Sequence, residues 1–407
     1  MSSLRASKDG LEIVEKAGKK KGWTKTTALW YTEALTTEAT LKRFWRQVPI
    51  QKETFTQICE VVGVNWEEVL DKILSPGTAR TDWEEPIDVS VFYGRTKELA
   101  DLERLILSDR SRLVVLSGMG GIGKTALVGK VWEQIKGKFD YTIQRSLSTA
   151  PPLPELLKDI VDFLSDGEQP EGGVPQLMEY LRKQRCLLVL DNVETIMSTG
   201  KTAGSFLSEY QDYSDLIRRV KAEQHKSCLL LISRERPEYT TWFRGEKIGL
   251  LGLSGLKKEA EELLKEQGLS GSEKELQTLN TLYGGNPLSL KLISALIQDV
   301  FNGRVTYYLK SGTIVVVLSE ILEYYFSRLS DLEKQIMVKL AVNSEPSSLS
   351  HLIEEISPPS TADLMQAVKS LIDRSLIEKI CTEGGDVITF TLPPEVRKYV
   401  VKRKFLK

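Results

Sequence analysis

The stretch Gly118-Met119-Gly120-Gly121-Ile122-Gly123-Lys124-Thr125 matches the pattern GxxxxGK[ST]. It follows an apolar run at 112–117 and precedes a segment with helical periodicity. Glycines let backbone N–H groups turn inward around phosphate oxygens, and the N-terminus of the next helix adds the positive end of its dipole. Lys124 can reach the β- and γ-phosphates, and the Thr125 hydroxyl can ligate Mg²⁺. Residues 118–125 therefore predict a phosphate-binding loop, called the phosphate loop below.

Two further apolar runs end in charged residues that suit this loop. The run Leu187-Leu188-Val189-Leu190 ends in Asp191, which can hold Mg²⁺ through water if it lies beside the phosphate loop. Alone, that pattern is equally typical of any buried strand before a turn. The run 229–232 leads into Ser233-Arg234, where an arginine could sense a γ-phosphate. The alternative for Arg234 is a solvated side chain in Arg234-Glu235-Arg236.

Short apolar runs alternate with amphipathic helical segments from about residue 89 to 255. The strands are expected at 112–117, 141–146, 186–191, 228–233 and 247–251. Three of them are continuously apolar, as expected when helices cover both faces of a sheet. This succession predicts an α/β fold with a doubly wound parallel sheet.

Composition excludes several classes of function. The 407 residues contain 55 Lys and Arg against 56 Asp and Glu, so no global basic field exists to attract nucleic acid or anionic membranes. The 4 cysteines are far apart and there are only 2 histidines, which disfavours a His/Cys metal site and fits buried thiols in a reducing compartment. The amino terminus lacks the apolar core of a signal peptide, and no apolar stretch is long enough to span a bilayer. We therefore expect a cytoplasmic protein without membrane contact.

Helical periodicity on both sides of the α/β segment predicts five parts. Residues 1–75 are expected to form an all-helical module, 76–88 a linker, 89–255 the phosphate-binding domain, 256–312 a helical subdomain and 313–407 a winged helix. In the first part, Thr36 or Thr37 is a plausible N-cap of a helix that Pro49 stops. In the last, helices precede a hairpin with strands at 376–382 and 387–392.

The order of the motifs resembles a known family. Phe92-Tyr93-Gly94-Arg95 precedes the phosphate loop, and Gly284-Gly285-Asn286-Pro287-Leu288 follows Arg234. Together the motifs resemble the NB-ARC nucleotide switch of the STAND class of P-loop NTPases, over about residues 89–407. The resemblance implies that Phe92, Tyr93 and Arg95 belong to a segment that wraps an adenine. It also implies that Pro287 packs on the adenine and that Arg234 is the sensor.

The resemblance further implies a cofactor and a cycle. The cofactor is ADP or ATP, with Mg²⁺ held by Thr125 and Asp191. The expected phosphate-binding residues are Gly118, Gly120, Gly121, Ile122, Gly123, Lys124, Thr125 and Ala126, and the expected catalytic residues are Lys124, Asp191, Glu194 and Arg234. Such proteins cycle between a closed ADP-bound monomer and an open ATP-bound homo-oligomer, with the winged helix as a lid. A slow ATPase that works as a signalling switch is therefore the leading hypothesis.

Two positions depart from the family pattern. Relatives commonly have a second acidic residue after the Mg²⁺ aspartate, as candidate base for the attacking water, and here that residue is Asn192. A carboxamide cannot accept a proton, so either Glu194 substitutes or hydrolysis is slow. The winged-helix histidine that contacts the ADP β-phosphate in relatives aligns with Pro393, which has no donor.

Other functions remain open at this point. Residues 37–66 look like a helix-turn-helix similar to those of phage-repressor type, and Lys42, Arg43 and Arg46 could face DNA phosphates. A transcription regulator is the resulting alternative, although nearly balanced charge favours a protein-binding adaptor. A turnover enzyme, such as a motor ATPase or small-molecule kinase, is disfavoured by Asn192 and by the lack of a second substrate motif. Relatives usually carry a repeat array after the winged helix, so a protein partner or sensor is expected but unidentified.

Overall fold

The computed structural model describes residues 3–70, 80–84, 89–167, 172–238, 247–343, 345–381 and 388–405. The chain divides into two compact units. One comprises Met1–Thr81, Lys136–Thr142 and Leu157–Tyr180, and the other Asp82–Ile135, Ile143–Leu156 and Leu181–Lys407. Within the described ranges, no helix combines the length and apolar character needed to cross a bilayer.

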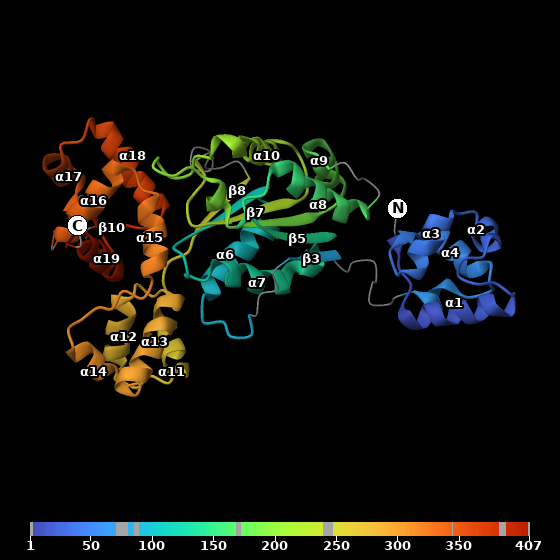
Figure 1. Cartoon of the computed structure of the whole chain (residues 1–407), viewed down its shortest axis with the longest axis horizontal. Helices are drawn as coiled ribbons and strands as arrows, with labels where there is room; N and C mark the ends of the chain where they lie inside the picture. The colour runs from blue at the N-terminus through green and yellow to red at the C-terminus, as the bar shows by residue number, and fades with distance from the viewer. Residues whose placement is uncertain are drawn as a thin grey trace. The chain divides into compact units, whose positions relative to one another are not determined.

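A six-stranded sheet with the order β3-β5-β6-β7-β4-β8 carries the phosphate loop. Its strands are β3 (Arg80–Trp83), β4 (Leu113–Ser117), β5 (Tyr141–Ser146), β6 (Cys186–Asp191), β7 (Cys228–Ser233) and β8 (Ile248–Gly252). Strand β4 pairs in parallel with β7 and β8, and β6 with β7. Figure 1 shows α6 (Thr96–Leu107) and α7 (Lys124–Ile135) on one face and α10 (Gln211–Ala222) on the other. The predicted doubly wound α/β fold is confirmed.

Complete burial explains why apolar and polar residues do not alternate along the central strands. Every residue of β4, β6 and β7 is buried, since helices cover both faces. In the parallel register Ser117 pairs with Ser233, and Leu190 pairs with Leu231, one residue before Asp191. The loops that follow β4, β6 and β7 therefore start at the same edge of the sheet. This is the carboxyl edge, where open α/β sheets bind ligands.

The expected linker is partly a strand. The sequence predicts a linker over 76–88, but Arg80–Trp83 within it forms β3 at the edge of the sheet. The backbone N–H of Arg80 donates to the Asp140 carbonyl at 2.9 Å. An edge strand pairs on one side only and needs no continuous apolar pattern, so this segment gave no strand signal. Residues 76–79 and 85–88 of the expected linker lie outside the described residues.

The described part of the amino-terminal module, residues 3–70, contains five helices and one small strand pair. The helices are α1 (Lys8–Lys20), α2 (Ala28–Glu33), α3 (Glu38–Trp45), α4 (Lys52–Glu60) and α5 (Trp66–Val69). Thr37, rather than Thr36, caps α3 by accepting from the Thr40 N–H at 3.2 Å, and the helix ends four residues before Pro49. Strand β1 (Ser3–Leu4) pairs antiparallel with β2 (Ile50–Gln51), so the expectation of an all-helical module was wrong in this detail. Two-residue strands are too short to leave a period-2 pattern.

Two helical segments follow the sheet. The first contains α11 (Ala260–Glu266), α12 (Glu273–Leu282), α13 (Pro287–Phe301) and α14 (Val305–Lys310). The second contains α15 (Ser319–Ser327), α16 (Asp331–Val342), α17 (Leu349–Ile356), α18 (Thr361–Asp373) and α19 (Pro394–Phe405). The expected hairpin strands are β10 (Glu378–Cys381) and β11 (Ile388–Thr391), each shorter than expected. Strand β9 (Ser347–Ser348) joins β11, and the turn at 383–386 lies outside the described residues.

The remaining helices lie between strands of the large sheet. They are α8 (Leu153–Ser165) and α9 (Val174–Lys183), which follow β5, and short 3₁₀ turns such as Val193–Ile196. The turn at Val193–Ile196 directly follows β6. It therefore places Glu194 near the end of the strand that carries Asp191.

Candidate functional site

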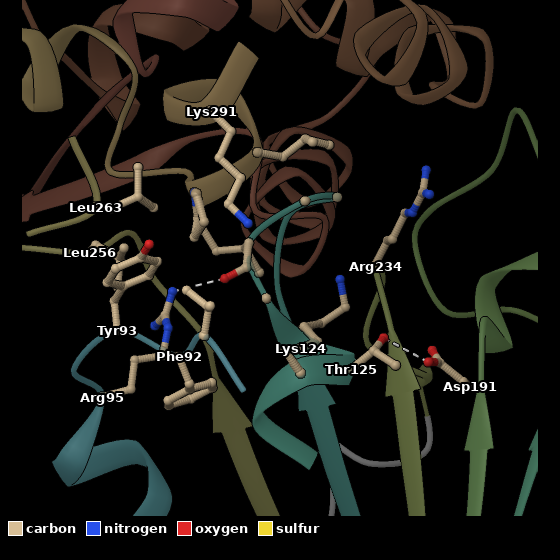
Figure 2. A pocket seen from close by; sticks show the side chains of 18 of the residues that line it. Phe92, Tyr93, Arg95, Lys124, Thr125, Asp191, Arg234, Leu256, Leu263 and Lys291 are labelled. Atoms are coloured by element: carbon tan, nitrogen blue, oxygen red, sulfur yellow. Dashed lines mark hydrogen bonds between the residues drawn. The ribbon is translucent and has the colours of Figure 1, made fainter. Parts of the chain in front are cut away.

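A cavity of about 380 Å³ opens where the phosphate loop leaves the sheet (Figure 2). This volume lies in the range of small-molecule pockets. The predicted site residues that line it are Phe92, Tyr93, Arg95, Gly120, Gly121, Ile122, Gly123, Lys124, Thr125, Ala126, Asp191, Glu194, Arg234 and Pro287. Of the predicted residues only Gly118 is not in the lining, and its carbonyl instead accepts a hydrogen bond from Lys124.

Lys124 is the central cation of the cavity. Its ammonium donates to the carbonyl oxygens of Gly118 and Met119 at 2.8 and 3.2 Å. Burial lowers the pKa of Lys124 from 10.5 to about 8, and Arg234 adds to this effect while Glu194 and Asp191 oppose it. A desolvated ammonium gains more from an anionic ligand than a solvated one does. Lys124 is therefore poised to bind phosphate.

Thr125 and Asp191 meet although 66 residues separate them in the chain. The Thr125 hydroxyl donates to Asp191 Oδ2 at 2.7 Å, while Asp191 Oδ1 accepts from the Asn192 N–H at 2.7 Å. Burial raises the pKa of Asp191, and these two hydrogen bonds counteract the rise. Mg²⁺ prefers oxygen donors and usually takes one or two from protein, completing its shell with phosphate and water. This pair of oxygens fits such an ion.

Buried Glu194 and half-buried Arg234 form an ion pair at the opposite end of the cavity from Phe92 (Figure 2 labels Arg234 and Phe92). Arg234 Nε lies 3.1 Å from Glu194 Oε1. The other carboxylate oxygen, Oε2, accepts from the Ser233 hydroxyl at 3.2 Å and from the Arg234 N–H at 3.1 Å. Both oxygens of Glu194 are thus engaged, which limits its use as a proton acceptor.

Asn192 occupies the position where a base was expected. Its backbone is left-handed with φ 59°, a conformation that Asn tolerates better than most residues. Its side-chain amide donates to the Ser146 hydroxyl at 3.1 Å. The carboxamide therefore lines the cavity as a hydrogen-bonding group without basic character.

Aromatic and apolar side chains line the other end of the cavity. Arg95 braces the loop there, since its guanidinium donates to the Ile122 carbonyl at 2.8 Å (Figure 2). Tyr93 donates a hydrogen bond to Glu266 of α11, and burial together with this carboxylate raises the pKa of Tyr93 to about 12. Pro287 contributes from the first turn of α13. An apolar cavity end beside a phosphate-binding loop suits a purine base.

Some lining residues were not predicted. Leu256 and Leu263 extend the apolar end, and Lys291 of α13 points toward the phosphate loop (Figure 2). Within the described part of the chain, the Lys291 ammonium has no hydrogen-bond or ion-pair partner. Lys291 follows Pro287 by four residues, so helical spacing puts both on one face of α13. That spacing is a signal that sequence reasoning could have used.

Pro393 lies outside this cavity. It lines a neighbouring cavity of about 240 Å³ together with Met119 and Ile122 of the phosphate loop. The carboxylate two residues later, Glu395, is buried and accepts from the backbone N–H groups of Val317 and Leu318 and from the Ser289 hydroxyl, at 2.8, 3.1 and 2.9 Å. Burial raises the pKa of Glu395, an effect that these three hydrogen bonds oppose. Glu395 thus anchors the chain internally, two residues after Pro393.

The residues of this site match a known family. The model of the NB-ARC domain matches residues 96–206, which include the phosphate loop, Asp191 and Glu194. This chain contains an NB-ARC domain. The resemblance to the NB-ARC family, drawn from the order of the motifs, is thereby confirmed.

Three known proteins are similar to this chain over much of its length. An uncharacterized WD repeat-containing protein from Nostoc sp. (strain PCC 7120) is 34% identical, with 98% of this chain and 36% of that protein covered. A disease resistance-like protein from Arabidopsis thaliana is 24% identical, with 70% and 24% covered. The Walker-type ATPase of Pyrococcus abyssi has a TM-score of 0.52 at 15% identity, with 81% of this chain and 99% of that chain covered. The chain spans 36% or less of the first two relatives, and the third likeness concerns the fold alone.

Proposed function

We propose that this NB-ARC protein is a nucleotide-dependent signalling switch. It binds ADP or ATP with Mg²⁺, hydrolyses ATP slowly, and couples the bound nucleotide to domain opening and homo-oligomerisation. One observation carries the proposal: a single cavity joins Lys124, Thr125, Asp191 and Arg234 to an apolar slot that ends at Pro287. Each of these groups has a complementary part in an adenine nucleotide.

The chain's own residues account for binding. The N–H groups of the phosphate loop and the Lys124 ammonium bind the polyphosphate, and Phe92, Tyr93 and Pro287 enclose the base. Mg²⁺, held by Thr125 and Asp191, would neutralise charge on the β- and γ-phosphate oxygens. Arg95 keeps the loop in place through the Ile122 carbonyl. Binding thus needs no large change in the phosphate loop.

Slow hydrolysis is expected because neither candidate base among the described residues of the cavity, Asn192 or Glu194, is free to accept a proton. Asn192 cannot accept the proton of an attacking water. Glu194 is engaged by Arg234 and Ser233. ATP would therefore persist long enough to act as a signal.

The five expected parts are proposed to act as the members of the switch. Residues 89–255 and 256–312 hold the nucleotide, residues 313–407 form a winged helix that works as a lid, and residues 1–75, after the linker 76–88, form an effector or adaptor module. Moving a lid from mostly closed to mostly open needs roughly 5.5 kcal/mol of differential affinity. The γ-phosphate contacts of Lys124 and Arg234 are the proposed source. We further propose a cytoplasmic location and a protein partner or sensor region that supplies the trigger.

Contacts within the amino-terminal module favour an adaptor over a DNA-reading domain. Lys42 Nζ lies 2.8 Å from Glu38, and the Arg43 guanidinium donates to the Pro49 carbonyl at 3.2 Å. Two of the three cations expected to face DNA phosphates are thus engaged within the module. A salt-dependent shift on specific DNA, lost in Arg43→Ala and Arg46→Ala, would support the transcription-regulator alternative.

The decisive experiment identifies the nucleotide and its consequence. Nucleotide retained after purification is released and identified, and calorimetry then follows ADP and ATP, each with Mg²⁺, binding to stripped protein. Light scattering compares the oligomeric state with each nucleotide. We expect retained adenine nucleotide in the native chain, none in Lys124→Ala, and a larger assembly with ATP. Absence of binding heat with either nucleotide would overturn the proposal.

A further inference from the structure

Helix α15 (Ser319–Ser327) directs one face at the phosphate loop and Arg234. Ile321, Tyr324 and Tyr325 follow the i, i+3, i+4 spacing that places side chains on one helix face. A Cβ built on Gly120 would lie 2.9 Å from Ile321 Cγ2 and 3.5 Å from Arg234 Nε. Gly120, Arg234 and this face of α15 are therefore packed together at one point.

Tyr325 contacts the loop by a buried hydrogen bond. The Gly120 N–H donates to the Tyr325 hydroxyl at 3.0 Å, and Tyr325 is only 1% exposed. The Gly120 carbonyl accepts from the Asn286 amide at 2.9 Å, so both polar groups of this residue are bound by protein. A buried N–H without an acceptor is costly, so whatever displaces Tyr325 has to offer an acceptor of its own.

Tyr324 contacts the guanidinium of Arg234. The Arg234 guanidinium lies over the Tyr324 ring, 5.1 Å from its centroid, and the same side chain is paired with Glu194. Such cation–π contacts stabilise a guanidinium, more so when it is shielded from water. Arg234 is thus held on two sides by the protein.

We propose that Tyr324 and Tyr325 set the preference of this protein between ADP and ATP. They hold the Gly120 N–H and the Arg234 guanidinium, the two adjacent donors that a γ-phosphate would take at this end of the cavity. ADP leaves both contacts intact, whereas ATP has to replace them. The inference rests on the proposed function and deepens it by naming the residues that discriminate the terminal phosphate.

Tyr325→Phe tests the proposal with the smallest change. It keeps the ring and removes the acceptor of the Gly120 N–H. Calorimetry on stripped full-length protein gives Kd for ADP and for ATP, each with Mg²⁺. Because one hydrogen bond is at stake, we expect the ratio Kd(ATP)/Kd(ADP) to fall by roughly 2- to 10-fold. An unchanged ratio in folded Tyr325→Phe protein would overturn the proposal.

Matched variants separate this effect from a general loss of stability. Tyr213→Phe removes another buried hydroxyl, which donates to the Pro151 carbonyl at 2.8 Å away from the cavity, and its ratio is expected to stay at the native value. Tyr324→Phe keeps the ring over Arg234 and should also leave the ratio unchanged, whereas Tyr324→Ala should lower it. Equal shifts in Tyr213→Phe and Tyr325→Phe would count against the proposal. Native protein that binds neither nucleotide would instead refute the proposed function.

Discussion

Burial shifts the pKa values of two charged residues in the cavity, Lys124 and Asp191. Lys124 is a conventional phosphate-loop lysine in position, yet burial lowers its pKa to about 8. Asp191 is shifted the other way by the same cause, since burial disfavours each charged form. A bound phosphate would favour the charged form of Lys124, and a bound Mg²⁺ that of Asp191.

Nucleotide affinity should therefore depend on pH through Lys124. Its ammonium is charged below about pH 8, and a bound phosphate raises its pKa again. Binding above pH 8 thus takes up a proton, and affinity should fall by up to about tenfold per pH unit there, after a fall of only about twofold between pH 7 and 8. Calorimetry at pH 9 in two buffers of different ionisation enthalpy measures the uptake. A binding enthalpy that is the same in both buffers would contradict this assignment.

Asn192 offers a test of the missing base. Aspartate also tolerates the left-handed backbone at this position, and the Ser146 hydroxyl can donate to it. Asn192→Asp should raise steady-state ATP hydrolysis by about tenfold or more if a proton acceptor is limiting. Asn192→Ala, which adds no base, is the control and should not raise the rate. An unchanged rate in Asn192→Asp would point to Glu194 or to no base at all.

Helix α13 connects the helical subdomain to the phosphate loop through its first turn. Asn286 caps the helix, since its Oδ1 accepts from the N–H groups of Leu288 and Ser289 at 3.0 and 3.3 Å. Its amide nitrogen donates to the Gly120 carbonyl. Pro287 occupies the first helical position, where a missing N–H does no harm. One residue therefore starts the helix and fixes the loop.

Asn286→Ala should damage both stability and binding. Loss of an N-cap costs about 1 kcal/mol, and the freed Gly120 carbonyl adds to this cost. Ser272→Ala is a matched control, because Ser272 caps α12 in a capping box and lines no part of the nucleotide cavity. Denaturant unfolding and nucleotide dissociation are measured on both variants. We expect a larger stability loss in Asn286→Ala than in Ser272→Ala and faster nucleotide release only in Asn286→Ala, and equal release rates would refute the double role.

Across the larger unit, the sheet and the carboxyl-terminal helices share a buried ionic cluster. Glu235, the residue after Arg234, accepts from Arg328 Nε at 2.7 Å and from the guanidinium of Arg374. Arg374 also reaches Glu333, with Nε 3.3 Å from Oε1. Glu235, Glu333 and Arg374 are fully buried. The cluster therefore links the end of β7 to helices far along the chain.

Removing the central carboxylate should strongly destabilise this unit. Glu235→Ala leaves two arginines buried without their shared partner, a change that typically costs about 3–5 kcal/mol. Asp215→Ala removes an exposed partner of Arg218 on α10 and should cost under about 1 kcal/mol. The midpoints of denaturant unfolding of the two variants measure the difference. A Glu235→Ala midpoint close to that of Asp215→Ala would show that the cluster adds little.

Local sequence was sufficient to predict the phosphate loop, the ends of β6 and β7, and the layered α/β fold. Glycine spacing and continuous apolar runs are properties of short segments, and they impose backbone geometry and burial wherever the segment lies. The strands β3 and β9 could not be predicted from the sequence. Their residues, Arg80-Thr81-Asp82-Trp83 and Ser347-Ser348, carry no apolar pattern and become strands only by pairing with neighbouring strands.

The contacts of Tyr325 and Glu235 could not be foreseen in the same way. Their partners Gly120 and Arg374 lie 205 and 139 residues away in the chain. A tyrosine at helical spacing and a Glu between two arginines look like ordinary core and surface residues until packing brings the distant segment alongside. The contacts on Gly120 and Arg234 therefore depend on the tertiary structure, because they join segments far apart in the chain. The phosphate loop itself is determined by its eight consecutive residues.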